Sequence, residues 1–444
     1  MSDDHTSQAW GIYGGILKDY VKSSNIKRIA AKGAVLNNVF CTNSICVPSR
    51  ATILTGEYSN RNGVYTLGDA LSPEKDNIAK QLQQAGYQTA MFGKWHLKKI
   101  PAGFDTFNVL PGQGVYHDPT FLNKNNWNDN ERSGDTIKGF VDDITTAMSI
   151  DWMKERQADK PFFLMCHFKS THEPFDFPAR FKDLYKGVEF PYPASFLDSG
   201  ASTTGRSFPG QPLEEMGSRY VKASTGPFWT SYPELPFSKT GLSPIEARKK
   251  IYQKMIRDYL RCVAGINDNL GKLLDYLEAT GLDKNTVIIY ASDQGYFLGE
   301  HNFMDKRMMY EESLRMPFII AYPNEIKAGT QLDDMVLNTD FAPLFADYAG
   351  ITRPAYMQGR SFRENLKGKK PKDWRTSMYY RYWEHHPNRP AHFGIRDTRY
   401  KLIFFYGQPL GMKGASKVTS PPAWEFYDLQ KDPNEIHNSI NDKN

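Results

Sequence analysis

The most informative segment of the sequence is Cys41-Thr42-Asn43-Ser44-Ile45-Cys46-Val47-Pro48-Ser49-Arg50-Ala51-Thr52-Ile53-Leu54-Thr55-Gly56. Pro48 suits the first turn of a helix, because its missing N–H needs no partner there, and Gly56 suits the end of one. The sequence therefore predicts a helix with Cys46 at its N-terminus. That end carries partial positive charge, and Arg50 follows on the same face one turn later. A nucleophile that faces an anionic group fits this position; a small buried thiol beside a helix cap is the alternative.

The spacing of Cys46 and Arg50 separates two families that use a reactive cysteine. The tyrosine-phosphatase loop requires an arginine six residues after the cysteine, where this chain has Thr52. Cys-x-Pro-Ser-Arg followed by Ala-x-x-x-Thr-Gly instead resembles the signature of the type I sulfatases, members of the alkaline phosphatase-like superfamily. The resemblance implies that a formylglycine-generating maturation enzyme oxidises Cys46 to formylglycine.

Length and composition are compatible with a large enzyme. The 444 residues can form one large α/β domain with a smaller appendage. The net charge is only +5, with acids and bases interspersed, which does not indicate the clustered basic face of a nucleic-acid-binding protein. The aromatic content of 14% fits either large cores or platforms that stack on sugar rings. Cys41, Cys46, Cys166 and Cys262 form no CxxC pair, and a Cys41–Cys46 disulfide is left open.

The sequence contains no apolar run of 18 residues, so we expect no membrane span. The start, Met-Ser-Asp-Asp-His, lacks the apolar region of a signal peptide. In the family that the signature resembles, an apolar strand precedes the position of Asp3 and Asp4, so we expect the first strand to be short or trimmed. The resemblance further implies a periplasmic, outer-surface or extracellular protein of a bacterium.

Helical and strand patterns alternate over most of the chain. The apolar run 162–166 is typical of a strand buried on both faces, and from Ile251 to Leu277 apolar residues recur every three or four positions. Such alternation predicts an α/β fold with a mostly parallel sheet covered on both sides. Strands are expected at 34–40, 88–92, 162–166, 287–291 and 318–322, and helices at 77–86, 138–157 and 244–280.

The resemblance implies an alkaline-phosphatase-like α/β/α sandwich with a large mixed sheet. We expect a catalytic domain at 1–365, with an insertion at 174–243 that is rich in Pro, Gly and Ser. Short alternating aromatic segments near 379–383 and 399–406 predict a small antiparallel sheet. We assign it to a C-terminal α+β subdomain at 366–444 that contributes to the substrate pocket.

Two oxygen-rich pairs, Asp3-Asp4 and Asp293-Gln294, point to a metal site. Hard oxygen ligands suit Ca²⁺ or Mg²⁺ rather than Zn²⁺. An Asp-Asp pair alone is more often a turn or a helix cap. In sulfatases, however, such pairs hold one divalent cation, usually calcium, against the formylglycine. The resemblance thus implies a Ca²⁺ site, with Mg²⁺ less favoured, formed by Asp3, Asp4, Cys46, Asp293 and Gln294; Gln294 replaces the commoner Asn.

Four further residues match the family's motifs: Lys94 and His96 in Gly-Lys-Trp-His, His172 in Thr-His-Glu-Pro and Lys306 in Met-Asp-Lys. Arg50, Lys94 and Lys306 can neutralise sulfate oxygens. The resemblance implies that hydrated formylglycine attacks sulfur and that His172, helped by Lys306, protonates the leaving oxygen. His96 would then deprotonate the second hydroxyl, which eliminates sulfate.

Specificity in this family lies outside the sulfate pocket, in the loops at 103–135 and 174–243 and in the C-terminal aromatic segment. The run Trp-Glu-His-His-Pro-Asn-Arg-Pro at 383–390 suits stacking on a sugar ring and bonding to its hydroxyls. We therefore favour a sulfated carbohydrate substrate, as for N-acetylglucosamine-6-sulfatases and ulvan-type sulfatases. Candidate substrate-binding residues, each with surface packing as the alternative, are His117, His301, Arg381, Trp383, His385, His386 and Arg389.

Two other functions stay open at this point. One is hydrolysis of phosphonate or phosphate esters, because some members of the superfamily with that activity share formylglycine. The other is a pseudo-enzyme that binds sulfated glycans without turnover. The presence of Cys46, Arg50, His172 and Asp293 together favours a sulfuric ester hydrolase over a pseudo-enzyme.

Overall fold

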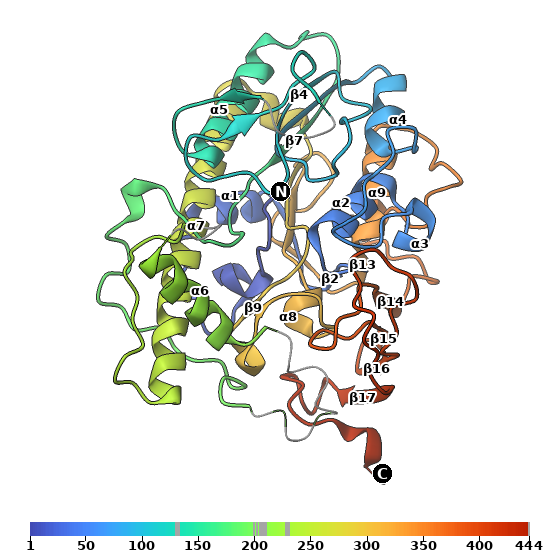
Figure 1. The fold of residues 1–444 in the computed structure, drawn as a ribbon. Coiled ribbons are helices and arrows are strands. Elements are labelled where there is room, and N and C mark those ends of the chain that lie inside the picture. Colours follow the sequence, from blue (N-terminus) through green and yellow to red (C-terminus); the bar gives the residue numbers. More distant parts are fainter. Residues whose placement is uncertain (129–133, 199, 201–202, 204–210, 227–230, 443–444) are drawn as a thin grey trace.

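The computed structural model of the protein describes residues 1–128, 134–198, 200, 203, 211–226 and 231–442. A mixed central sheet lies between two layers of helices, and a smaller antiparallel sheet forms the C-terminal part (Figure 1). The predicted α/β architecture is confirmed.

The central sheet has two hydrogen-bonded parts. Strands β4 (Thr106–Leu110), β3 (Gln88–Lys94) and β7 (Phe162–His167) are parallel. The second part has the order β12-β1-β11-β8, and β11 runs antiparallel to both its neighbours. Its strands are β12 (Thr330–Leu332), β1 (Gly33–Leu36), β11 (Phe318–Ala321) and β8 (Ile288–Ala291).

The first three residues of the chain connect these two parts. The Met1 carbonyl accepts from the Phe168 N–H at 2.8 Å, and the Asp3 N–H donates to the Ser170 carbonyl at 2.9 Å. On the other side, the Ser2 N–H donates to the Ala291 carbonyl at 3.0 Å. Asp3 and Asp4 are therefore delivered between the carboxyl ends of β7 and β8, where functional groups gather in such sheets.

Helices cover both faces of the central sheet (Figure 1). On one face α1 (Ser24–Ala31) and α5 (Val141–Glu155) pack against the long α7 (Pro244–Ala279), which begins with a Ser243–Glu246 capping box. On the other face lie α2 (Cys46–Thr55), α4 (Ile78–Gln84) and α9 (Phe341–Tyr348). Each layer has its own large apolar core against the sheet.

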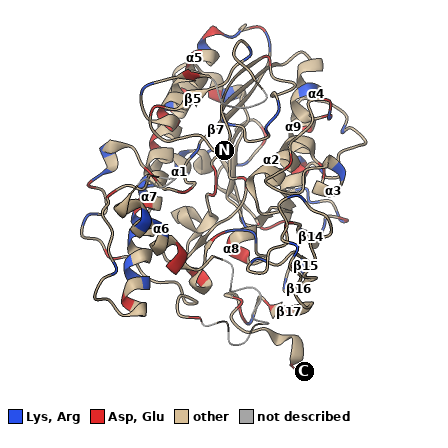
Figure 2. Ribbon diagram, viewed as in Figure 1, with Lys and Arg blue, Asp and Glu red and all other residues tan. Residues whose placement is uncertain are grey.

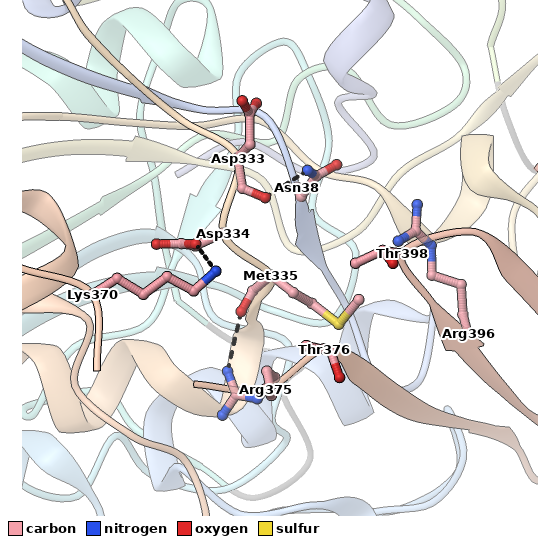
Figure 3. A pocket seen from close by; sticks show the side chains of 9 residues that line it. All are labelled: Asn38, Asp333, Asp334, Met335, Lys370, Arg375, Thr376, Arg396 and Thr398. Carbon is pink, nitrogen blue, oxygen red and sulfur yellow. Dashed lines mark hydrogen bonds and ion pairs between the residues drawn. The ribbon is translucent and has the colours of Figure 1, made fainter. Parts of the chain in front are cut away.

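The C-terminal sheet contains four antiparallel strands in chain order: β14 (Ser377–Tyr382), β15 (His392–Asp397), β16 (Tyr400–Phe405) and β17 (Ala423–Asp428). Its inner face packs with Phe40, Ile45 and Tyr310 in a third core. A small polar cavity lies at this junction, lined by residues that include Asp334, Lys370 and Arg396 (Figure 3). None of the predicted site residues lines that cavity.

The structure departs from the predicted elements at two places. The strand expected at 34–40 is divided into β1 and β2 (Val39–Phe40), because Asn37 and Asn38 instead bond to the 332–333 segment. The insertion contains an unpredicted helix, α6 (Leu213–Thr225), which packs on α7 through Leu213, Met216 and Tyr220.

The remaining short elements lie in the connections. They are α3 (Ser59–Asn62), β5 (Thr120–Phe121), β6 (Asp135–Thr136), β9 (Phe297–Leu298), β10 (Met304–Asp305), α8 (Glu311–Leu314), β13 (Val336–Leu337) and α10 (Arg363–Leu366).

Charge and hydropathy add two observations on the described residues. Lys and Arg are interspersed with Asp and Glu over the fold (Figure 2). Among the helices that the structure describes, none is both long and apolar enough to cross a membrane.

Candidate active site

Helix α2 begins at Cys46 and ends before Gly56, as predicted. Gly56 has a φ of 69°, the left-handed conformation that ends a helix with little strain in glycine, and its N–H donates to the Thr52 carbonyl at 2.8 Å. All ten residues of the helix are buried. Cys46 therefore lies at a helix N-terminus inside the protein, and all four cysteines are free thiols, so the Cys41–Cys46 disulfide is absent.

Arg50 binds three other segments of the site. Its Nε donates to Asp293 Oδ2 at 2.9 Å, and its Nη1 donates to the Lys94 carbonyl at 2.5 Å. Nη2 lies 3.6 Å from Asp3 Oδ1. These contacts bring α2, the N-terminal segment, and the ends of β3 and β8 to one place.

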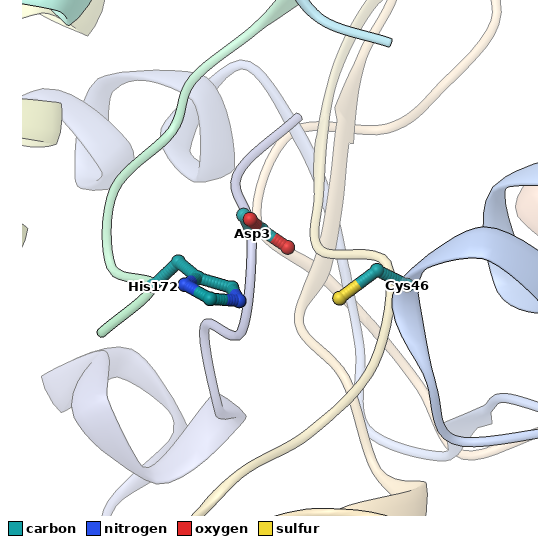
Figure 4. A group of neighbouring side chains, drawn as sticks. All are labelled: Asp3, Cys46 and His172. Carbon is teal, nitrogen blue, oxygen red and sulfur yellow. The ribbon is translucent and has the colours of Figure 1, made fainter. Parts of the chain in front are cut away.

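Three carboxylates meet beside the thiol. Oxygens of Asp3, Asp4 and Asp293 all lie within 4.8 Å of one another, and a second close group is formed by Asp3, Cys46 and His172 (Figure 4). Gln294 Nε2 donates to Asp4 Oδ1 and lies 3.7 Å from Cys46 Sγ. The five residues predicted to bind the metal are thus brought together.

The predicted lysines and His172 surround the same carboxylates. Lys94 Nζ pairs with Asp3, and Lys306 Nζ lies 2.5 Å from Asp4 Oδ2. His172 Nε2 lies 3.8 Å from the same Asp4 oxygen, and its Nδ1 lies 2.7 Å from the Glu173 carbonyl oxygen, which orients the ring. The site therefore combines cations, a histidine and a thiol around three acids.

Burial shifts the pKa values in this cluster. It raises the pKa of Asp293 to about 7, with the nearby charge of Asp3 adding to the effect. It also raises the pKa of Asp4, although Lys306 opposes the shift. For Asp3, burial would raise the pKa, but Lys94, His172 and Arg50 lower it well below the usual value. The crowding of acids is what a bound cation would relieve.

Cys46 is not activated as a thiolate in this environment. Burial raises the pKa of its thiol to about 12, with the positive charge of Lys306 only partly opposing the shift. A cysteine nucleophile needs the opposite shift. The site therefore fits a cysteine that is converted to another group better than one that reacts as a thiol.

His96 is buried and lies in the left-handed region, with a φ of 57°. Among the described residues, its Nδ1 has no hydrogen-bond partner. Burial lowers the pKa of His96 well below its usual value, and the charge of Lys94 lowers it further. A neutral imidazole in this position can accept a proton.

Three of the candidate substrate-binding residues lie in contact with segments that form the site. The Arg381 N–H donates to the Thr42 carbonyl at 3.1 Å, and the Arg381 guanidinium lies 3.5 Å from the ring centre of Trp383. Gln211, with its amide oriented to suit both neighbours, donates to Asp305 and accepts from Arg389 Nη1 at 2.7 Å. Gln211 therefore links Arg389 to Asp305, the residue that precedes Lys306.

The four candidate histidines have other contacts. His301 is buried, with its Nδ1 3.2 Å from Asp198 and its ring against Tyr310. His385 uses both ring nitrogens on backbone groups of Ala391 and Val418. His386 Nδ1 accepts from the Asn388 N–H at 3.2 Å, and His117, half exposed, lies 3.0 Å from Asp176. None of these contacts is with a residue of the predicted metal or sulfate set.

Sequence reasoning missed several residues that contact the site. Gln113 Oε1 accepts from Lys94 Nζ at 2.5 Å, and the Gln113 carbonyl accepts from Lys169 Nζ at 3.0 Å. Tyr116 OH donates to the His172 carbonyl at 2.5 Å. Gln113 and Tyr116 belong to the loop that the sequence placed near the site, but composition does not say which of its residues point inward.

Comparison with known proteins agrees with this geometry. Residues 1–351 match the family model described as "Sulfatase", and residues 299–444 match the one described as "N-sulphoglucosamine sulphohydrolase, C-terminal". The chain belongs to the sulfatase family. A sulfatase is a sulfuric ester hydrolase, so the predicted enzyme class is confirmed.

Three relatives show how the sulfatase compares over its length. It is 37% identical to an N-acetylglucosamine-6-O-sulfatase of Bacteroides thetaiotaomicron, over 99% of this chain and 81% of the relative. An ulvan-active sulfatase of Formosa agariphila is 25% identical, over 99% of this chain and 74% of the relative. A solved structure of a protein "in complex with its substrate D-Glucosamine-2-N, 6-O-disulfate" is 35% identical with a TM-score of 0.88, over 100% of this chain and 92% of the other.

Proposed function

We propose that this sulfatase removes sulfate from sulfated sugars, with a glucosamine sulfated at O6 as the preferred unit. One observation carries the proposal: Cys46, at the buried N-terminus of α2, lies among Arg50, Lys94, Lys306 and three acids within a few ångströms. Cations around a nucleophile position suit a tetrahedral anion. The high similarity to a glucosamine-6-sulfatase supports the sugar and the position.

The residues present fit a divalent cation. Asp3 Oδ1 and Gln294 Oε1 are buried without a hydrogen-bond partner among the described residues, and both belong to the predicted ligand set. Carboxylate and amide oxygens are the ligands that Ca²⁺ prefers. We infer that Asp3, Asp4, Asp293 and Gln294 hold Ca²⁺ beside residue 46, where it would polarise a sulfate oxygen.

We further infer that Cys46 is the precursor of formylglycine. The unreactive thiol and its position against the acids support this inference. Formylglycine supplies a nucleophile that can release sulfate again without attack by water on sulfur.

The chain's own residues then bind the anion and move protons. Lys94, Lys306 and Arg50 hold the sulfate oxygens. His172 presents its Nε2 toward the site, because Nδ1 is turned to the Glu173 carbonyl. Burial and the charge of Lys94 lower the pKa of His172 well below its usual value in the anion-free site. A bound sulfate beside this ring favours its protonated form, so we place delivery of a proton to the leaving oxygen at His172 Nε2. His96, neutral and buried, is the base that completes turnover.

The sugar would be recognised beside Lys306. Asp305 pairs with Arg307 and reaches Arg389 through Gln211, which places one acid and two arginines next to the sulfate lysine. Such groups bond well to sugar hydroxyls and to a second sulfate. Burial would raise the pKa of Asp305, but Arg307, Lys306 and Arg389 lower it, so the carboxylate stays an acceptor.

The test is release of sulfate from defined sugars that carry sulfate at the 2-N, 3-O, 4-O or 6-O position. The mature enzyme, made with the maturation enzyme present, should act on the 6-O esters with the highest kcat/KM. Matched aryl sulfate and aryl phosphate esters belong in the same panel. A preference for the phosphate would overturn the proposal in favour of a phosphate or phosphonate hydrolase.

A Cys46→Ala variant tests the nucleophile. It should still bind a sulfated glucosamine but lose turnover by at least about a thousandfold. The Cys41→Ala variant removes a buried thiol outside the site and serves as the matched control. Mass spectrometry of the Cys46 peptide shows whether conversion to formylglycine accompanies activity; turnover by a fully unmodified protein would contradict the mechanism.

A further inference from the structure

Gln113 contacts a lysine of the predicted sulfate site, although it belongs to none of the sequence motifs. Its Oε1 accepts from Lys94 Nζ at 2.5 Å, and the same Nζ pairs with Asp3. Lys94 is fully buried at the end of β3, so its ammonium depends on protein groups for its hydrogen bonds. The position of the Lys94 ammonium is therefore set by one acid and one neutral amide.

These two bonds leave the Lys94 ammonium one direction for a ligand. A lysine ammonium has three N–H donors and no acceptor, so the Gln113 amide has to face it with its oxygen. With Asp3 as its only partner, the ammonium could move together with that carboxylate. The second bond, to Gln113, fixes Nζ from another side. The third N–H then has one defined direction, which is available to an anion.

A turn encoded in the local sequence delivers the Gln113 amide. Leu110, the last residue of β4, pairs with Lys94 across the two parallel strands, and the turn at 111–114 follows directly. A hydrogen bond of 2.9 Å from the Gly114 N–H to the first carbonyl of the turn closes it. Both glycines of the turn have positive φ values, 50° and 65°, a conformation that favours glycine. A Cβ at Gly114 would also lie 2.8 Å from the Leu110 side chain, so this close approach requires glycine.

Lys169 and Tyr116 hold this turn from the side of β7. Lys169 Nζ donates to the Gln113 carbonyl at 3.0 Å and lies 4.8 Å from the centre of the Tyr116 ring. Tyr116 OH donates to the His172 carbonyl at 2.5 Å, and the His172 N–H donates to the Lys169 carbonyl at 3.1 Å. Lys169 and Tyr116 are both buried. The backbone that carries the Gln113 amide is therefore fixed by the same segment that carries the predicted proton donor.

We propose that Gln113 is a positioning residue of the sulfate site, which fixes the Lys94 ammonium so that its third N–H faces a sulfate oxygen. The proposal rests on the proposed function, in which Lys94 binds the sulfate. A neutral amide suits this role, because it orients the cation without cancelling the charge that attracts the anion. Gln113 acts through Lys94 and needs no contact with the substrate.

The mature enzyme with Gln113→Met tests the proposal, because methionine keeps the length of the side chain but offers no oxygen acceptor. The KM for a sulfated glucosamine and the inhibition constant of inorganic sulfate should each rise at least about tenfold. The kcat should stay within about twofold of wild type, since Lys94 binds the sulfate oxygen alike before and during cleavage. Gln113→Asn keeps the amide but is one methylene too short, and it should give the same result. Gln84→Met, at an exposed glutamine at the end of α4, is the matched control and should change neither constant.

A double-mutant cycle separates this proposal from the function on which it rests. Lys94→Met alone should lower kcat/KM by about 10²–10³. Added to Lys94→Met, Gln113→Met should change kcat/KM by less than about twofold, because the group that Gln113 positions is then gone. Both single variants and the double variant are measured below their unfolding midpoints.

Four results would overturn the proposal in different ways. If Lys94→Met leaves the inhibition constant of sulfate unchanged, Lys94 does not bind the anion and the premise fails. If Lys94→Met weakens sulfate binding but Gln113→Met and Gln113→Asn do not, the anion site stands and only the positioning role is wrong. If Gln113→Met costs as much in the Lys94→Met background as in wild type, Gln113 acts independently of Lys94. A fall in kcat and in the thermal unfolding midpoint at an unchanged KM would make Gln113 a packing residue of its loop.

Discussion

Two clusters of buried charged residues in this sulfatase are arranged in different ways. The site cluster contains Asp3, Asp4, Arg50, Lys94, Asp293 and Lys306. The junction cluster, between α8 and the C-terminal sheet, contains Glu311, Arg396, Lys401 and Glu435. Both are enclosed by the protein, so each has to compensate the cost of removing charge from water.

The junction cluster compensates most of that cost with ion pairs, although burial still raises the pKa of Glu435. Lys401 lies 3.0 Å from Glu311 and 2.6 Å from Glu435, and Arg396 Nη2 lies 3.0 Å from Glu311. Burial would raise the pKa of Glu311, but Lys401 and Arg396 lower it well below its usual value. In the site cluster, by contrast, three carboxylates converge within 4.8 Å of one another beside the Cys46 thiol, and the pKa of Asp293 is raised to about 7. The first arrangement serves stability, and the second leaves interactions free for ligands.

Removing a charge from the junction should cost stability rather than activity. In Lys401→Met, Glu435 loses its ion pair with Lys401, and we expect the free energy of unfolding to fall by about 3–5 kcal/mol. Urea unfolding measures this loss, while kcat/KM of the folded protein should stay close to the wild-type value. Lys431→Met, at an exposed lysine near the same end of the chain, is the control. An unchanged stability would show that the junction cluster is not structural.

The same kind of change in the site should cost activity as well as stability. In Lys306→Ala, the sulfate loses a cation that lies 2.5 Å from Asp4, and kcat/KM should fall by about 10²–10³, which corresponds to roughly 3–4 kcal/mol. The thermal unfolding midpoint should fall as well, because buried Asp4 loses its ion-pair partner, so kcat/KM is measured well below the unfolding midpoint of the variant. Lys186→Ala, at an exposed lysine, should leave both quantities unchanged. A loss of less than tenfold would remove Lys306 from the anion site.

The sequence predicted the site cluster far better than the junction cluster. Pro48 and Gly56 encode the limits of α2 locally, and strand ends place Lys94, His172 and Asp293 at one edge of the sheet. Nothing local encodes the contact of Lys401 with Glu435, which are far apart in sequence and look like ordinary surface charges. Gln113 was missed for the same reason: its bond to Lys94 depends on how a long loop closes. Helix α6 was hidden in a Pro- and Gly-rich stretch and is stabilised by packing on α7.

Calcium should stabilise the protein through the site cluster alone. A cation that binds only the folded state at about 100 times its dissociation constant adds about 2.7 kcal/mol to the free energy of unfolding. We expect thermal unfolding to shift upward with Ca²⁺ and to return with a chelator. Asp293→Asn should lose most of the shift. Lys401→Met should unfold at a lower temperature than wild type without Ca²⁺ but should show the same upward shift when Ca²⁺ is added. An equal shift in wild type and Asp293→Asn would place the cation elsewhere.

The last expected effect is a pH dependence of the free energy of unfolding that arises beside the junction cluster. Glu312, beside the junction, has its pKa raised from 4.5 to about 8, chiefly by burial and also by Glu300 and Glu435, with His301 opposing. The folded protein therefore holds a proton that the unfolded chain releases above pH 4.5, so this group contributes a loss of stability as pH rises from about 5 to 8. In Glu312→Gln that loss disappears, and the variant should gain roughly 2–2.5 kcal/mol on wild type between pH 5.5 and 7.5. Urea unfolding at pH 5.5 and 7.5 measures the difference, with Glu364→Gln at an exposed helix position as the control. If the free energy of unfolding changes equally with pH in Glu312→Gln and in wild type, Glu312 ionises freely in the folded protein. The junction would then tolerate an unpaired charge, as the active site does.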